Sequence, residues 1–213
     1  LPRVTKEQQH KPMNAGQRLE KAQSPYRDKQ FLYFLGFKIF FASCFFQLFT
    51  TIPLFFKEGL GLSEFNIGAI MAANGLLIAL FEMVIVFKLE GRKPYLILMS
   101  YGSALMGVAF LVLNIPFAGS FFVAISAMLV ITVAEMISMP FMNSFYIARS
   151  TERTRGQYAG MYTMAWSIAQ VIGSSAGAWF ADSYGFFNLW FTVSALCMVA
   201  AIGYYWLQSN AGK

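Results

Sequence analysis

The sequence predicts an all-α membrane protein built from six transmembrane helices. Only 12% of its 213 residues are charged and 57% are hydrophobic, whereas soluble domains carry about 25% charged residues. Six apolar stretches follow one another, each of about 20 to 30 residues, and a helix needs roughly 20 to cross the hydrocarbon core. The stretches lack the alternation of β-barrel strands. A soluble domain is therefore excluded, and no nucleic-acid partner is expected.

The apolar stretches divide the chain into three regions. Residues 1–29 are expected to form a basic cytoplasmic linker, because they contain seven Lys or Arg, three Pro and no apolar signal-peptide core. Residues 30–208 are expected to form the transmembrane domain, and residues 209–213 a cytoplasmic tail. The chain opens on Leu1, so we interpret it as a processed product or a piece of something longer. The predicted spans are residues 30–56, 64–87, 94–113, 119–148, 157–180 and 187–207.

The basic residues predict the orientation of these spans. Lys and Arg are enriched in cytoplasmic loops, and fourteen of the sixteen lie on one side of the membrane: in residues 1–29, in the loops at 88–93 and 149–155, and at Lys213. The opposite side holds only Lys57. We therefore expect both termini in the cytoplasm.

The fourth span carries a carboxylate near its middle. Glu135 lies 16 residues after Gly119 and 14 before Arg149, close to the bilayer midplane, where a charge costs about 2.5–3.5 kcal/mol on insertion scales. One interpretation is a structural carboxyl, protonated or hydrogen-bonded to a neighbouring helix. The other is a proton-handling site in a transport cavity, since secondary transporters hold coupling ions at this depth.

Two further charged residues are expected within the cytoplasmic half of the spans. Lys38 lies nine residues past Lys29, and Glu82 lies six before Lys88, so the two have similar depth on consecutive helices. We predict that Lys38 and Glu82 pair directly or through water. Snorkelling of Lys38 toward the headgroups is the alternative.

Several polar and aromatic side chains are candidates for the wall of a substrate cavity. Tyr162, Trp166 and Gln170 recur at helical spacing and share one face of the fifth span. Gln47 belongs to a polar stripe of the first span, and Asn143 follows Glu135 by two turns. Ordinary packing with interfacial anchoring is the alternative for the aromatic stripe. The third and sixth spans, which lack interior charges, are expected at the periphery.

Small residues in the fifth span predict close helix packing. Gly156 and Gly160 form one small-xxx-small element, and Gly173 and Gly177 form another. No catalytic residue, metal site or cofactor is predicted, because HExxH, paired-Asp and CxxC patterns are absent and the single histidine, His10, lies outside the spans.

Two long segments carry a resemblance to a known family. RSTERTRGQYAGMYTMAWSIAQVIGSSAGAWFADSYG resembles the tenth-to-eleventh helix region of major facilitator superfamily transporters, most of all the proton-coupled drug-efflux branch. VAEMISMPFMNSFYIA is similar too, with Glu135, Pro140 and Asn143 in the order common in that branch.

The loop KLEGRK is similar to the superfamily signature D-R-x-G-R-K. Gly91, Arg92 and Lys93 match, whereas Lys88 and Leu89 replace the first Asp and Arg. This departure puts a gating role of the loop in doubt.

The resemblance covers residues 30–208 and implies the C-terminal six-helix half of a twelve-helix transporter in a bacterial inner membrane. Its partners would be the lipid bilayer, a small-molecule substrate, protons and the missing N-terminal half. Spans one and four would line the cavity, with spans two and five at its sides and spans three and six outside. The main proton carrier lies in the N-terminal half of many such transporters, so a substrate-binding or structural role for Glu135 also stays open.

The function implied is proton-coupled export of an amphipathic small molecule by alternating access, with Glu135 exchanging a proton for substrate. Proton-coupled uptake of a metabolite, sugar or peptide by the same fold is the alternative. An oligomeric channel is remote because no filter loop or charged ring is present. An intramembrane enzyme is equally remote because the spans contain no histidine.

Overall fold

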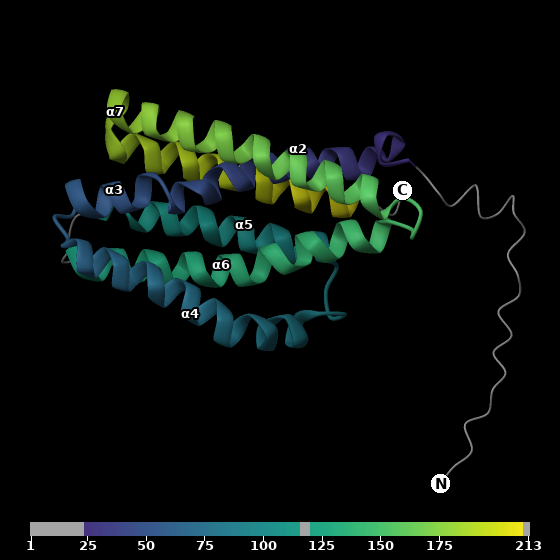
Figure 1. The fold of residues 1–213 in the computed structure, drawn as a ribbon, viewed down its shortest axis with the longest axis horizontal. Helices are drawn as coiled ribbons and strands as arrows, with labels where there is room; N and C mark the ends of the chain where they lie inside the picture. The colour runs from purple at the N-terminus through teal and green to yellow at the C-terminus, as the bar shows by residue number, and fades with distance from the viewer. Residues whose placement is uncertain (1–23, 116–119, 211–213) are drawn as a thin grey trace, which may run out of the picture.

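The computed structural model describes residues 24–115 and 120–210, which form a bundle of long helices lying alongside one another (Figure 1). The predicted linker therefore lies mostly outside the described residues, as do residues 211–213 of the tail. No strand occurs in the described ranges, and the all-α fold is confirmed. The elements are η1 (Pro25–Arg27), α2 (Lys29–Phe45), η2 (Phe46–Leu48), α3 (Thr51–Glu58), α4 (Glu64–Leu89), α5 (Tyr95–Val112), α6 (Ser120–Arg149) and α7 (Arg155–Ser209).

The last helix, α7, reverses direction at Gly185. This residue has φ 80° and ψ 162°, in a region that is accessible mainly to glycine. The ring of Phe34 lies 6.4 Å from that of Tyr162 and 6.1 Å from that of Tyr204, although a straight helix would separate the last two by about 60 Å. Residues 155–184 and 186–209 are therefore two arms lying side by side (Figure 1). These arms correspond to the fifth and sixth predicted spans.

The first predicted span is interrupted rather than continuous. A 3-10 turn, η2, separates α2 from α3, and Thr50 between them has φ −116° and ψ −71°. Pro53 lies in the first turn of α3, where its missing N–H leaves no intrahelical bond unmade. In an unbroken helix the Pro53 ring would collide with the Phe49 carbonyl, so the chain restarts its helix just before the proline.

Helix α5 lies against the helices of the fourth and sixth predicted spans, and its expected place at the periphery of the transporter stays a prediction. It packs against both α6 and α7, whereas α4 packs chiefly against α6. Glycine permits the close approach: a Cβ at Gly102 would lie 2.7 Å from the Cβ of Ser138 and 2.9 Å from the Ala134 carbonyl. Helix α4 buries only Ile70 and Asn74, and it forms the lower edge of the bundle in Figure 1.

Candidate functional site

Glu135 meets a single side-chain partner across the interface between α6 and α4. The Nδ2 of Asn74 donates a hydrogen bond of 3.4 Å to Glu135 Oε1 and a second contact of 3.6 Å to Met128 Sδ. Both Glu135 and Asn74 are 5% exposed. Asn74 Oδ1 is buried and has no partner within the described residues. Asn74 also lines a pocket of about 210 Å³ between α4 and α6.

This pairing suits a carboxyl group that changes its charge. An amide offers both a donor and an acceptor: its N–H groups bind a carboxylate, and its oxygen can accept from a carboxylic acid. Asn74 can thus hydrogen-bond either state of Glu135 after a turn of its amide. Glu82 is half-buried on the same helix α4, eight residues after Asn74. The sequence places Asn74 deep in the second span, but no pattern pairs it with Glu135.

The predicted pair between Lys38 and Glu82 is wrong. Lys38 is fully buried on α2, and its Nζ donates to the Tyr162 carbonyl at 2.6 Å. The ammonium lies 3.1 Å from the Tyr162 ring centroid and 5.0 Å from that of Trp166. The reason is tertiary: α2 packs on α7, and α4 packs on α6, so consecutive helices at equal depth are not neighbours.

Three of the five predicted cavity residues line one pocket. Asn143, Tyr162 and Trp166 surround a volume of about 260 Å³ together with Met139 and Thr163, between α6 and the first arm of α7. Gln170 lies one turn beyond Trp166, is exposed, and is not part of this wall. An aromatic surface with a few polar groups can hold an amphipathic solute.

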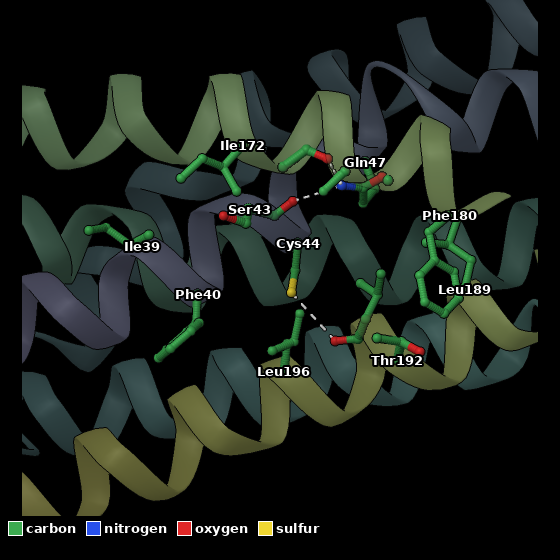
Figure 2. Close-up of a pocket in the computed structure, with 14 residues that line it drawn as sticks. Ile39, Phe40, Ser43, Cys44, Gln47, Ile172, Phe180, Leu189, Thr192 and Leu196 are labelled. Atoms are coloured by element: carbon green, nitrogen blue, oxygen red, sulfur yellow. Dashed lines mark hydrogen bonds between the residues drawn. The ribbon is translucent and has the colours of Figure 1, made fainter. Parts of the chain in front are cut away.

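Gln47 lies in a helix interface, away from the other predicted cavity residues. Its Nε2 donates to the carbonyls of Ser43 at 3.0 Å and Gly173 at 2.8 Å, and its Oε1 accepts from Thr51 at 2.8 Å. It borders a separate pocket of about 300 Å³ between α2 and the two arms of α7. Figure 2 shows this pocket, with Gln47 and Ser43 directed at the first arm. Because its amide nitrogen and oxygen are both hydrogen-bonded within the fold, Gln47 links η2 to the first arm of α7.

The two small-residue elements differ in what surrounds them. A Cβ at Gly173 would lie 2.6 Å from the Ser43 carbonyl oxygen, and one at Gly177 would collide with the Gln47 amide. Both glycines therefore permit the close packing that their spacing predicts. Gly156 and Gly160 have open space where a Cβ would project, so they make no close approach to another helix of the described chain and their packing role stays a prediction.

The loop signature lies between α4 and α5. Gly91 has φ 74°, which explains a glycine at that turn. Arg92 and Lys93 are exposed, and Lys93 Nζ lies 4.9 Å from the Tyr101 ring centroid. None of the three lines the pocket of Asn143, Tyr162 and Trp166, which we call the aromatic pocket.

A charged cluster ties together the ends of three helices. Arg149, the last residue of α6, donates from Nε and Nη2 to the two oxygens of Asp28 at 2.8 and 2.7 Å, and from Nη1 to Gln30 at 2.7 Å. Tyr158 of α7 donates to the same carboxylate at 2.9 Å, and the Phe31 amide donates at 3.1 Å.

This cluster was not predicted from the sequence, although a signal was present. Asp28 directly precedes the first apolar span, as an N-cap residue does, and Arg149 directly ends the fourth. Burial raises the pKa of Asp28, but the hydrogen bonds from Arg149, Phe31 and Tyr158 and the Arg149 charge outweigh it and hold the pKa below its ordinary value of 3.8. The cluster holds together the start of α2, the end of α6 and the first turn of α7.

Comparisons with known proteins agree with this architecture. A family model described as Major Facilitator Superfamily matches residues 1–174. A "Na(+), Li(+), K(+)/H(+) antiporter" from Planococcus maritimus is 25% identical over an alignment 198 residues long, and the match covers 85% of this chain and 45% of the antiporter. The chain thus spans less than half the length of this relative. No solved structure matches.

Proposed function

The chain belongs to the major facilitator superfamily, and from this premise we propose that it is the C-terminal half of a proton-coupled secondary transporter. The observation that carries the proposal is the contact between Glu135 and Asn74. A carboxyl group that is 5% exposed and accepts a hydrogen bond from a neutral amide has no cation among its side-chain partners in the described residues to keep it ionised. Such a group can take up and release a proton as access alternates between the two sides of the membrane.

The solute site is proposed in the pocket of Asn143, Tyr162 and Trp166. Asn143 and Glu135 lie on one helix, eight residues or about 12 Å apart. A movement of α6 caused by solute at Asn143 therefore also displaces Glu135. Aromatic faces and the Met139 thioether favour a solute with an apolar body. We propose export as the direction, with uptake of a metabolite, sugar or peptide as the alternative.

A second candidate is exchange of alkali cations for protons. The name of the Planococcus maritimus relative favours it, and so does the chemistry of the site. Glu135 Oε1 and the unpartnered Asn74 Oδ1 are oxygen ligands next to each other, and hard cations are bound by oxygens. In this second candidate, proton and alkali cation compete for one carboxylate.

The other half of the transporter is proposed to cover the outer faces of α4 and of the first arm of α7. Large apolar side chains are widely exposed there: Met83 76% and Leu80 59% on α4, and Val171 68% and Met164 63% on α7. Both helices lie at the rim of this half-bundle, where a second half can reach them.

Proton flux tests the proposal directly. The complete transporter is reconstituted in acid-loaded liposomes that contain a pH-sensitive dye. NaCl, LiCl, KCl or benzyltrimethylammonium chloride is then added outside. Proton release in response to at least one of these solutes is expected. If none moves protons although the same liposomes exchange solute, proton coupling is wrong.

A further inference from the structure

The ammonium of Lys38 is buried without a carboxylate. Its exposed fraction is 0%, and neither ion pair formed by the described residues includes it. Its partners are the carbonyl of Tyr162 at 2.6 Å, the Tyr162 ring at 3.1 Å and the Trp166 ring at 5.0 Å. A buried charge without an opposite charge is expensive, so these neutral groups must stabilise it.

The groups around Lys38 are those that recognise organic cations. Aromatic faces attract ammonium groups through the ring quadrupole, most strongly where water is excluded, and a carbonyl oxygen accepts from the N–H. Two rings and one carbonyl thus form a complete site for a monovalent ammonium. The protein supplies both the site and, through Lys38, its occupant.

The same two rings also line the aromatic pocket. Tyr162 and Trp166 border the volume of about 260 Å³ that Met139, Asn143 and Thr163 complete. A molecule in this pocket therefore lies against the residues that hold the Lys38 ammonium. Lys38 itself does not line the pocket and is fully buried, so a cationic head can take the place of its ammonium only after Lys38 withdraws.

We propose that Tyr162 and Trp166 bind the cationic head of an amphipathic monocation, and that Lys38 is a tethered competitor for this position. The competitor occupies the site when the ligand is absent and must withdraw when the ligand enters. The proposal rests on the proposed function only in taking the pocket as a solute site. It makes Lys38 a determinant of affinity for cations, whatever the direction of transport or the role of Glu135.

Equilibrium binding tests the competition without any proton flux. Benzyltrimethylammonium is titrated into the complete purified transporter in a calorimeter, and neopentylbenzene serves as its uncharged isostere. Lys38→Met keeps an apolar stem of similar length and removes the charge. We expect this variant to bind the cation about tenfold more tightly, which corresponds to about 1.4 kcal/mol and lies within the range of cation–π attraction. Neopentylbenzene binding is expected to change little.

Matched variants locate the effect. Lys38→Arg keeps a cation on the rings and is expected to retain weak binding. Tyr162→Leu or Trp166→Leu, added to Lys38→Met, removes a ring and is expected to abolish the gain, whereas Tyr162→Phe keeps the ring and preserves it. Lys38→Gln replaces Lys38→Met if the latter does not fold.

Three results would overturn the proposal. The first is unchanged or weaker cation binding by Lys38→Met. The second is an equal gain for neopentylbenzene, which would reveal added space alone. The third is binding of benzenesulfonate by the wild type that Lys38→Met loses, since Lys38 would then recruit an anion. Loss of proton flux with the binding pattern intact would instead count against the proposed function.

Discussion

The Asn74 amide on α4 lies 3.4 Å from the Glu135 carboxylate on α6, and both residues are 95% buried. This hydrogen bond joins the proposed proton site to the helix that buries the fewest residues in the bundle, since α4 buries only one other residue, Ile70. A change in the charge of Glu135 therefore acts on a helix that meets few other residues of this half-bundle. We infer that this contact is where protonation is converted into helix movement.

Asn74→Leu is expected to slow proton-coupled flux by roughly tenfold or more. A hydrogen bond to a charged group contributes about 1.5–3 kcal/mol, and 1.4 kcal/mol is a factor of ten. The initial rate of dye-reported proton flux in liposomes measures the effect. Asn66→Leu, near the N-terminal end of the same helix, is the matched control and is expected to keep the wild-type rate. A wild-type rate for Asn74→Leu would remove Asn74 from the mechanism.

Gly173→Ala is expected to destabilise the protein by about 1–3 kcal/mol, as overpacking of a core does. The new Cβ would lie 2.6 Å from the Ser43 carbonyl oxygen, and backbone cannot move aside as a side chain can. Thermal unfolding in detergent measures the loss. Gly160→Ala, on the same arm but with open space at the Cβ, is the control and is expected to be neutral or slightly stabilising. Equal effects at both positions would contradict the observed packing.

Asp28→Asn is expected to lower stability at neutral pH, by an amount that shrinks in acid. The pKa of Asp28 lies below 3.8 in the folded protein, so its ionised form stabilises the fold above that pH. This stabilisation is lost as the pH falls through the folded-state pKa. Unfolding temperatures at pH 7 and pH 3 measure the difference, with the exposed Glu152→Gln as control. A gap between wild type and Asp28→Asn that widens in acid would contradict the sign.

The proposed orientation predicts which loops a membrane-impermeant maleimide reaches. Both native cysteines, Cys44 and Cys197, are buried and are replaced by alanine as background. Glu58→Cys, at the exposed end of α3, is expected to react on intact cells. Arg153→Cys, in the loop before α7, is expected to react only after the membrane is opened. The reverse pattern would place the basic loops outside.

Hydropathy predicted the helices closely because membrane spanning is a property of a single segment. The structure has α4 at Glu64–Leu89, α5 at Tyr95–Val112 and α6 at Ser120–Arg149, within two residues of the predicted spans 64–87, 94–113 and 119–148. The interruption before α3 was missed because hydropathy does not report backbone geometry. Pro53 acts on the turn that precedes it, and the last residue of η2, Leu48, lies five residues before the proline. Local chain geometry, and not composition, decides where the helix breaks.

Contacts between helices were harder to predict, because they depend on which helices become neighbours. Depth along the membrane suggested Glu82 for Lys38, but the neighbour of α2 is α7, and an aromatic face took the place of a carboxylate. Likewise Gly156 and Gly173 begin identical small-residue spacings, and only Gly173 faces another helix in this chain. Of the residues that line the aromatic pocket, the sequence predicted Asn143, Tyr162 and Trp166. The two aromatic residues could be grouped because they share one helix face.

Proton and solute flux through Glu135→Gln in liposomes tests most directly whether Glu135 carries the coupled proton. Glutamine keeps the size and hydrogen-bonding capacity of the side chain and removes its ability to titrate. Solute exchange without a pH gradient shows whether the variant is folded and still alternates. We expect Glu135→Gln to keep exchanging the solute that moves protons in the wild type. Proton flux and gradient-driven accumulation are expected to be lost across the pH range. Wild-type accumulation and proton flux in Glu135→Gln would contradict it.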